Sequence, residues 1–473
     1  GEAKLALREV KPLDRNEAGI AAAIAALRER FGDRLVTVAA IREQHGHTLT
    51  YLPNQPPDAV LFAQSTDEVR EAVKVCAAHH VPLIPFGTGT SLEGGVNAPA
   101  GGVCIDLGRM DGIVRVNAED LDAVVQPGVT REALNVHLRD TGLFFPIDPG
   151  ANASLGGMAA TRASGTNAVR YGTMREDIVS LTAVMPDGSV IRTGGRARKS
   201  SAGYDLTRLL VGSEGTLGII TELTVRLYGI PEAMASATCS FPDIEAACNA
   251  TIMAMQAGIP LARIELMDRA CVEAVNAYSH TRLPVSPLLL LEFHGSAAGV
   301  REQSETFGEI ASETGGSGFE WVTDPEERTR IWKARHDVYF AMQAAAPGKR
   351  TIANDACVPI SRLADCVGET ERDIARSGLY GPILGHVGDG NFHIALFVDP
   401  RDADELARAE DVLERLSHRA LAMEGTCTGE HGIGQGKRTF LRHEHGDGAD
   451  LMAAIKRAID PCNIMNPGKV LPD

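Results

Sequence analysis

The sequence contains no pair of cysteines with C-x-x-C spacing, and its nine cysteines are an odd number. A zinc site built only from cysteines and a disulfide framework are therefore disfavoured. We expect a protein of a reducing compartment whose thiols are mostly buried. The cysteines are Cys76, Cys104, Cys239, Cys248, Cys271, Cys357, Cys366, Cys427 and Cys462.

Long apolar runs and clusters of positive charge are also missing. No stretch approaches the ~20 apolar residues that span a bilayer, and the run PLLLLEF at 287–293 has the length of a strand. The first ten residues lack the apolar core of a signal peptide. The net charge of −16, with no lysine or arginine cluster to oppose it, would repel nucleic acid. We therefore expect neither a transmembrane segment nor a nucleic-acid partner.

Three common motifs of nucleotide-binding and hydrolytic enzymes fail on a few residues. In PFGTGTSLEGG at 85–95 the glycine spacing is G-x-G-x-x-x-x-G, not the G-x-G-x-x-G of an NAD-binding Rossmann turn. A P-loop around Lys437 would need glycine where His431 stands and serine or threonine where Arg438 stands. A G-x-S-x-G nucleophile elbow fails around Ser91. An NAD-type site, a P-loop and a hydrolase elbow are thus disfavoured.

Helix and strand patterns are plentiful, and their character changes after residues 227–233. Before that point short strands and glycine-rich turns alternate with helices, and Thr66 is the expected capping residue of one of them. Segment 311–320 has the composition of a loop. From 473 residues we expect two or three domains, one of them an α+β domain with an antiparallel sheet. The helical patterns lie at 15–31, 66–80, 243–258, 298–313 and 361–376, and apolar strand candidates at 287–295 and 381–388.

Glycine is abundant, with 49 residues, and it gathers in three stretches at 85–95, 148–174 and 209–227. The stretches are also rich in serine, threonine and alanine. Small residues let backbone N–H groups approach a ligand without a side chain in the way. One such stretch alone would indicate a turn-rich loop. Three of them in one half of the chain indicate one extended ligand wrapped by the backbone.

These three stretches resemble the flavin-binding domain of the vanillyl-alcohol oxidase family, which holds FAD between two α+β subdomains. The resemblance implies that the first stretch binds the pyrophosphate, the second passes the isoalloxazine, and the third contacts the ribose and adenine. Some members tether FAD to a histidine in or near the first stretch, where this chain has Glu93; we therefore expect non-covalent FAD. The matching positions are Phe86, Gly87, Thr88, Gly89, Thr90, Ser91, Pro149, Gly150, Leu155, Gly156, Gly157, Ala160, Thr161, Ser164, Gly165, Gly172, Glu214, Gly215, Ile219 and Ile220.

The octapeptide HVGDGNFH places His386 and His393 around a turn-forming GDGN. A strand–turn–strand structure would bring the two imidazoles together at the neck of a hairpin. Two imidazoles are half of a metal site, and Glu430 in TGEHGIGQGK is a candidate third ligand. The alternative is two strand histidines that hydrogen-bond to the backbone. His443 and His445 have charged neighbours, and we expect them in a solvated loop.

HVGDGNFH, GEHGIG and the tail NIMNPGKV at 463–470 together resemble the FAD-linked D-2-hydroxy-acid dehydrogenases. That group includes cytochrome-linked D-lactate dehydrogenases, the glycolate oxidase flavin subunit and D-2-hydroxyglutarate dehydrogenases. The resemblance implies that His386, His393 and Glu430 bind a divalent metal, zinc or manganese. It also implies that His431 faces the flavin and that Asn466 lies near the flavin. Because an imidazole titrates near neutral pH, we expect His431 to be the base that takes the hydroxyl proton while hydride leaves C2 for FAD.

The segment IWKARHDVYFA at 331–341 resembles the part of these enzymes that carries a carboxylate-binding arginine, here Arg335. The planar fork of a guanidinium matches a carboxylate in a way that Lys333 could not. Where 2-hydroxyglutarate enzymes have a lysine for the distal carboxylate, this chain has Ala353. The expected substrate is therefore a short D-2-hydroxy acid, D-lactate first and pyruvate its product. D-2-hydroxyglutarate and glycolate are the alternatives.

The resemblance divides the chain into an N-terminal helical segment at 1–54, an FAD-binding domain at 55–232, a substrate or cap domain at 233–425 and a return to the FAD domain at 426–473. It implies a separate electron acceptor, a cytochrome, quinone or electron-transfer flavoprotein, because the sequence has no haem motif C-x-x-C-H. We expect a cytoplasmic protein, or one held at the inner membrane by that acceptor; a homodimer is compatible with the sequence.

Three rival interpretations stay open at this point. A metallohydrolase would use the same histidines and glutamate with a metal-bound water. A non-catalytic FAD- or metal-binding module would leave the adjacent Glu430 and His431 without a purpose. The alkyl-dihydroxyacetone-phosphate synthases share the expected fold but not the redox outcome.

Overall fold

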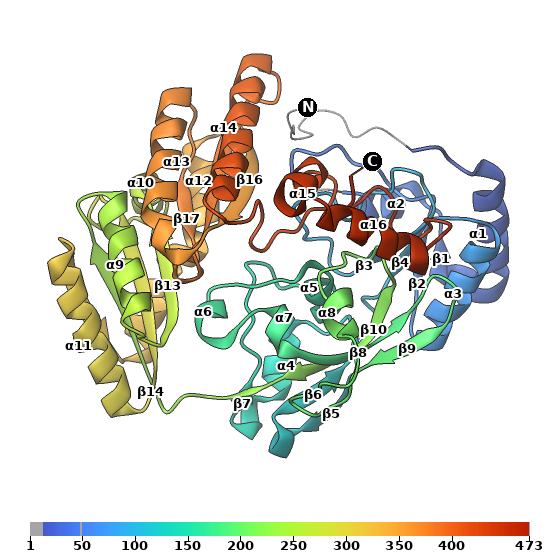
Figure 1. Cartoon of the computed structure of the whole chain (residues 1–473), viewed down its shortest axis with the longest axis horizontal. Helices are drawn as coiled ribbons and strands as arrows, with labels where there is room; N and C mark the ends of the chain where they lie inside the picture. The colour runs from blue at the N-terminus through green and yellow to red at the C-terminus, as the bar shows by residue number, and fades with distance from the viewer. Residues whose placement is uncertain (1–12, 48–49, 473) are drawn as a thin grey trace. The chain divides into compact units, whose positions relative to one another are not determined.

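The computed structural model describes residues 13–47 and 50–472, which fall into two compact units (Figure 1). Unit 1 contains 165–171 and 231–429, and unit 2 contains most of the remainder, including 172–230 and 430–472. The chain therefore passes from unit 1 to unit 2 between Gly429 and Glu430, inside the motif GEHGIG.

The first sheet of unit 2 has four strands in the order β1-β2-β4-β3, with β4 parallel to both β2 and β3. Its core also takes in the C-terminal tail through Ile464 and Met465. The Leu83 N–H donates to the carbonyl of Ile464 at 2.7 Å, and the Asn466 N–H donates to the carbonyl of Leu83 at 2.8 Å. The strands are β1 (Leu35–Val36), β2 (Ala59–Phe62), β3 (Leu83–Phe86) and β4 (Val103–Asp106).

Helix α3 (Thr66–Ala78) shows why these segments fold as they do. It buries Val69, Ala72, Val73 and Cys76, which lie at the i, i+3, i+4 and i+7 positions of one helical face. The expectation that Thr66 caps it is wrong. Ser65 is the N-cap, and its hydroxyl accepts from the Glu68 N–H at 3.2 Å. Helix α1 (Glu17–Phe31) contributes Ile20, Ala23 and Leu27 to the same core.

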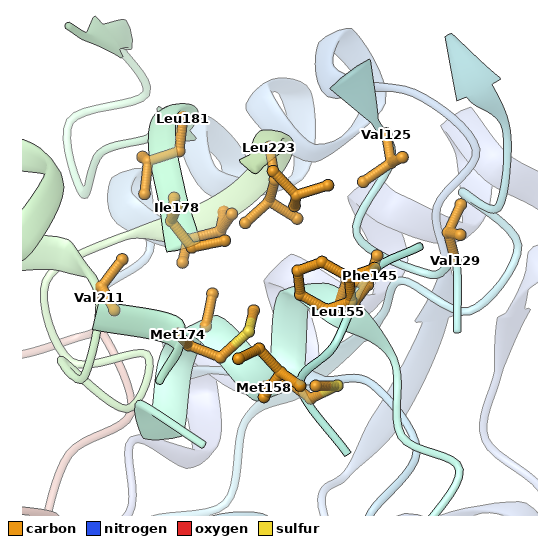
Figure 2. Packing of buried hydrophobic residues seen from close by; sticks show 14 of the residues in the cluster. Val125, Val129, Phe145, Leu155, Met158, Met174, Ile178, Leu181, Val211 and Leu223 are labelled. Carbon is orange, nitrogen blue, oxygen red and sulfur yellow. The ribbon is translucent and has the colours of Figure 1, made fainter. Parts of the chain in front are cut away.

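The second sheet of unit 2 is antiparallel, with five strands in the order β5-β6-β10-β8-β9. Figure 2 shows its core, in which Leu155 and Met158 of helix α5 (Leu155–Thr161) lie with Phe145 and the strand residues. Because Leu155 and Met158 are buried, the position of the glycines between them is fixed, and these glycines belong to the second glycine-rich stretch. The strands are β5 (Ile113–Asn117), β6 (Asp122–Val125), β8 (Ile178–Val184), β9 (Val190–Thr193) and β10 (Ile219–Arg226).

A fully buried carboxyl group, Asp177, lies at the end of helix α7 (Met174–Asp177) in unit 2. The Tyr228 hydroxyl donates to Asp177 Oδ1 at 2.7 Å. Burial raises the pKa of Asp177 to about 7, although the tyrosine hydrogen bond opposes the rise. An acid whose pKa is higher in the folded chain contributes stability at low pH that is lost as pH rises through the folded pKa. For Asp177 this stability is lost between about pH 4 and pH 7.

We therefore expect Asp177→Asn to raise the free energy of unfolding at pH 8 and to change it little at pH 4. The neutral amide avoids the cost of a buried charge, which is up to about 4 kcal/mol for this pKa difference. Urea denaturation of variant and wild type at both pH values measures the effect. Asp140→Asn, at an exposed position of the same unit, is the control. An equal effect of Asp177→Asn at pH 4 and pH 8 would contradict the prediction.

Unit 1 is built on a seven-stranded antiparallel sheet in the order β15-β12-β14-β13-β17-β18-β16. Helices α10 and α12 cover one face and share a core with apolar residues of β13, β14 and β18. The strands are β12 (Ala233–Ser240), β13 (Leu261–Met267), β14 (Leu288–Gly295), β15 (Ser317–Val322), β16 (Arg350–Cys357), β17 (Ile383–Gly385) and β18 (Asn391–Val398). The helices are α6 (Ala168–Tyr171), α9 (Ile244–Gln256), α10 (Arg269–Ser279), α11 (Ala297–Glu313), α12 (Pro325–Ala345), α13 (Leu363–Ser377) and α14 (Ala403–Ala422).

The expected α+β domain with an antiparallel sheet is confirmed by unit 1. Two local expectations are wrong. The loop expected at 311–320 holds the edge strand β15, and the loop expected around His443 and His445 is helix α15 (Arg438–His445), although both histidines are exposed. Seven of the nine thiols are buried, as expected. No helix among the described residues is long and apolar enough to cross a membrane. The remaining elements of unit 2 are α2 (Ala39–His45), α4 (Arg131–His137), β7 (Leu143–Phe144), α8 (Leu206–Leu210), β11 (Tyr228–Gly229) and α16 (Gly448–Ile459).

Candidate active site

The two histidines of HVGDGNFH come together as expected, at the end of the β17–β18 hairpin. Their ring centroids are 5.0 Å apart with the rings nearly perpendicular, and the nitrogens available to a metal lie within 4.8 Å. Leu384 pairs with His393 across the hairpin. A 3₁₀ turn over Val387–Asp389 makes the connection, and only the second turn glycine, Gly390, has a positive φ, +77°. The geometry suits two ligands of one metal ion.

Behind His386 lies a buried carboxylate, Glu265 of β13. The His386 Nδ1 is 2.8 Å and 2.9 Å from the two Glu265 oxygens. The strand register produces this contact: Leu266 pairs with Gly385 in the antiparallel ladder, and Glu265 and His386 are the residues next to that pair. Burial alone would raise the pKa of Glu265, but the attraction and hydrogen bond of His386, with the charge of Arg335, lower it.

Arg335 of α12, the expected carboxylate-binding residue, lies at the same glutamate. Its Nε donates to Glu265 Oε1 at 3.1 Å, and its side chain is 19% exposed. An ion pair of this kind leaves the two NH₂ groups of a guanidinium able to grip a second carboxylate. Glu265 was not among the residues expected from the sequence. Its signal there is a lone acidic residue in the apolar strand LARIELM at 261–267.

A second buried carboxylate, Asp355 of β16, lies opposite His393 in the β16–β18 register. It accepts from the Gly429 N–H at 2.6 Å, from the Thr428 hydroxyl at 3.0 Å and from Asn391 Nδ2 at 3.2 Å. These bonds fix the last residues of unit 1 before the chain continues to Glu430. Asp355 was likewise missed, because strand alignment cannot be read from one sequence.

In unit 2, Glu430 and His431 are adjacent in a glycine-rich turn. The Ser164 hydroxyl donates to Glu430 Oε2, and His431 Nε2 is 3.7 Å from Glu430 Oε1. Ser164 is one of the expected flavin-binding positions, so the second glycine-rich stretch and the GEHGIG turn meet through this bond.

The Glu214 side chain organises that turn instead of pointing to open solvent. Its carboxylate accepts from the backbone N–H groups of Ile433 at 3.2 Å and Gly434 at 2.9 Å. Burial raises the pKa of Glu214, and the two backbone hydrogen bonds oppose the rise. Glu214 itself has a φ of +54°, which is unusual for a residue with a side chain. The third glycine-rich stretch thereby holds the segment that carries His431.

Asn466 is bound into the protein by its side chain. Its Nδ2 donates to the Glu214 carbonyl at 2.7 Å and the Gly95 carbonyl at 3.3 Å, and its Oδ1 accepts from Lys469 Nζ at 2.7 Å. Lys469 also donates to the carbonyl of Asn97 at 2.6 Å. Burial lowers the pKa of Lys469 to about 7, against the attraction of Glu214. The tail thus ties the first glycine-rich stretch to the third.

The first two glycine-rich stretches lie against each other and leave buried polar atoms for a ligand. A Cβ on Gly87 would be 2.3 Å from Ser154 Oγ, so a larger residue there would have to displace that hydroxyl. Among the described residues, Ser91 Oγ and Ser154 Oγ are buried and have no hydrogen-bond partner. Such atoms suit a bound polar group, and the residues present therefore fit a flavin nucleotide.

The other expected flavin-binding residues divide by burial. The side chains of Leu155, Ile219 and Ile220 lie in the hydrophobic cores, so only their backbone can contact a ligand. Thr88 and Gly150 are exposed. Gly165 belongs to unit 1, and all the other expected flavin positions belong to unit 2.

Known proteins resemble the chain over nearly its whole length. A family model for an FAD binding domain matches residues 57–194, and one for the C-terminal domain of FAD linked oxidases matches residues 230–470. A probable mitochondrial D-lactate dehydrogenase of Danio rerio is 52% identical over 96% of this chain and 92% of that protein. The mitochondrial D-lactate dehydrogenase (cytochrome) of Arabidopsis thaliana is 45% identical over 88% of this chain and 74% of that protein.

The glycolate oxidase subunit GlcD of Bacillus subtilis is 35% identical over 88% of this chain and 89% of that protein. Among solved structures, p-cresol methylhydroxylase superposes with a TM-score of 0.80 at 19% identity and covers 98% of this chain and 99% of that one. An alkyldihydroxyacetonephosphate synthase gives a TM-score of 0.73 at 19% identity, over 98% and 88% of the two chains. At this identity the solved structures show a shared fold.

Proposed function

Because this chain belongs to the FAD-linked oxidases, and within them to the D-2-hydroxy-acid dehydrogenases that its motifs resemble, we propose that it oxidises D-lactate to pyruvate. The observation that carries the proposal is the arrangement around Glu265: this buried carboxylate contacts His386 and Arg335, and the imidazole of His393 lies beside that of His386. When bound, FAD supplies the two-electron oxidising power, and a divalent zinc or manganese ion supplies a Lewis acid for the substrate hydroxyl.

Arg335 binds the substrate carboxylate in this proposal. Its Nε is held by Glu265 at 3.1 Å, so the guanidinium enters the site with a fixed orientation. A fixed fork loses less side-chain entropy when it binds a carboxylate than a free lysine would. The substrate is therefore oriented by its acid group before any proton moves.

His386, His393 and Glu430 are the proposed metal ligands. The histidines already converge. The backbone of Gly429 is bonded to Asp355, which lies opposite His393. Glu430 is peptide-bonded to Gly429, so its Cα lies about 3.8 Å from that of Gly429. This short path supports Glu430 as the third ligand. Nitrogen and oxygen ligands suit both zinc and manganese.

His431 is the proposed base for the hydroxyl proton. It follows Glu430 directly in a turn that Glu214 holds by two backbone hydrogen bonds. An imidazole titrates near neutral pH and suits proton abstraction under physiological conditions. The position of its ring thus depends on a turn, and that turn is fixed by a carboxylate of the third glycine-rich stretch.

A short substrate is supported by the small residues beside His393. Ala353 and Ala395 face each other in the β16–β18 ladder, two residues along the strands from Asp355 and His393. Neither provides a cation for a second carboxylate, which disfavours D-2-hydroxyglutarate. Glycolate is the remaining alternative, and one curated relative is a glycolate oxidase subunit.

A separate protein accepts the electrons in this proposal, and relatives with cytochrome in their names favour a cytochrome. The FAD-binding family model removes the reason for the metallohydrolase interpretation, which used no flavin. The alkyl-dihydroxyacetone-phosphate synthase interpretation rests on fold alone. Release of a 2-oxo acid would exclude it.

An anaerobic visible spectrum of the FAD-loaded chain tests the function. We expect D-lactate to bleach the flavin band, L-lactate and D-2-hydroxyglutarate to leave it, and a chelator to prevent the bleaching. Pyruvate should form in equal amount to the flavin reduced. Rapid bleaching by glycolate or D-2-hydroxyglutarate but not by D-lactate would overturn the substrate assignment while keeping the family.

A further inference from the structure

Glu265 has two partners that the proposed reaction assigns to different tasks. His386 is a proposed metal ligand and Arg335 is the proposed grip on the substrate carboxylate. One buried carboxylate, 0% exposed in its side chain, contacts both of them. The three residues come from β13, from the turn after β17 and from α12.

The contact with His386 determines which nitrogen of that ring can bind a metal. An ionised carboxylate only accepts hydrogen bonds, so Nδ1, within 2.9 Å of both oxygens, carries the hydrogen. Nε2 then keeps its lone pair and can serve as the ligand atom of a metal ion. A carboxylate that orients a metal-binding histidine and increases its basicity is a common outer partner of metal sites.

The contact with Arg335 ties the guanidinium to the same group. Because Oε1 accepts from both His386 Nδ1 and Arg335 Nε, movement of one partner changes the position available to the other. Removing the buried carboxylate would also leave the positive charge of the arginine without a compensating negative charge. The substrate grip and the metal ligand therefore share one support.

We propose that Glu265 is the positioning residue of this site, which sets the tautomer and direction of His386 for metal binding and the direction of Arg335 for the substrate carboxylate. The inference rests on the proposed function, because it uses the roles given there to His386 and Arg335. It predicts that a single change at Glu265 weakens metal binding and substrate binding together.

The sheet offers a matched control in Glu292 of β14. This carboxylate is also buried and also contacts a histidine and an arginine: His294 Nε2 is 2.6 Å from Oε1, and Arg263 Nη1 is 3.7 Å from Oε2. It lies on the neighbouring strand, paired with Arg263 in the ladder. Glu292→Gln therefore reproduces the loss of a buried charge in the same sheet without touching His386 or Arg335.

The test compares wild type, Glu265→Gln and Glu292→Gln as FAD-loaded full-length protein stripped of metal. Calorimetric titration with Mn²⁺ and with Zn²⁺ gives the metal Kd, and steady-state kinetics at saturating metal give KM and kcat for D-lactate. Glutamine keeps the shape of the side chain but loses the charge. We expect Glu265→Gln to weaken metal binding about 10–100-fold and to raise KM, with thermal midpoint and flavin content close to those of Glu292→Gln.

Each result has a distinct meaning. Wild-type metal affinity in Glu265→Gln would overturn the positioning role while leaving the proposed function in place. An equal loss of metal affinity in Glu292→Gln would also overturn it, because the effect would then be general to the sheet. A wild-type protein that binds neither metal would refute the metal part of the proposed function and this inference with it.

Discussion

Replacement of His431 by asparagine is expected to slow reduction of the flavin by D-lactate about 10²–10⁴-fold, the range that a lost general base produces. FAD should stay bound, because the positions expected to hold it lie in the three glycine-rich stretches and the C-terminal tail, and none of them is altered. The turn should also persist, since Glu214 holds it through the backbone of Ile433 and Gly434, not through the imidazole. Rapid mixing of the oxidised enzyme with D-lactate under anaerobic conditions measures the rate.

His443→Asn is the matched control for this experiment. His443 is an exposed histidine of α15 in the same unit, so the same substitution there should leave the rate unchanged. A rate within threefold of wild type in His431→Asn would assign the proton to another acceptor. A loss of flavin would show instead that the imidazole supports the cofactor site.

Replacement of His386 by alanine is expected to remove metal and activity together. One of two converging imidazoles is lost, and only His393 and one carboxylate remain as ligands. The loss of metal affinity should therefore be far larger than the ~10–100-fold loss that follows removal of an outer partner. Glu430→Ala should give the same result if it is the third ligand. Elemental analysis after dialysis against a metal buffer, with flavin reduction in parallel, measures both quantities.

His418→Ala controls for a general effect of losing a histidine. His418 lies on α14 with 41% of its side chain exposed, in the same unit as His386. Full flavin reduction by a metal-free His386→Ala protein would end the metal hypothesis. Loss of activity with retained metal would point to a defect in Arg335 transmitted through Glu265.

The sequence was enough to predict the fold, because the features that carry it are local or motif-based. Helical spacing marked α3, α9, α11 and α13, and short strands do alternate with helices before residue 230, as expected. The vanillyl-alcohol oxidase type of fold is confirmed by the family models and by the solved structures. The hairpin around GDGN was also predicted, since its turn chemistry is encoded in adjacent residues.

The supports of the site could not be predicted, because they depend on register and on long-range packing. Glu265 meets His386 only because Leu266 pairs with Gly385. Asp355 accepts a hydrogen bond from Gly429, which lies 74 residues later in the sequence. Glu214 was expected at the nucleotide, and its carboxylate binds the backbone of the turn that carries His431. A one-residue shift of β13 or β16 would turn the side chain of Glu265 or Asp355 away from its partner.

The C-terminal tail has a consequence for how the protein is made. Leu83 is hydrogen-bonded to Ile464 and Asn466, and Gly95 and Asn97 to Lys469, so the first glycine-rich stretch is completed by residues that lie more than 370 positions later in the sequence. Ribosomes deliver the N-terminal part first. The nascent chain must therefore leave β3 and its glycine-rich stretch unfinished until residues 464–469 have left the exit tunnel. The flavin site can be completed only after residues 464–469 have been made, and a chain cut short before residue 464 would lack a finished site although it contains all three glycine-rich stretches.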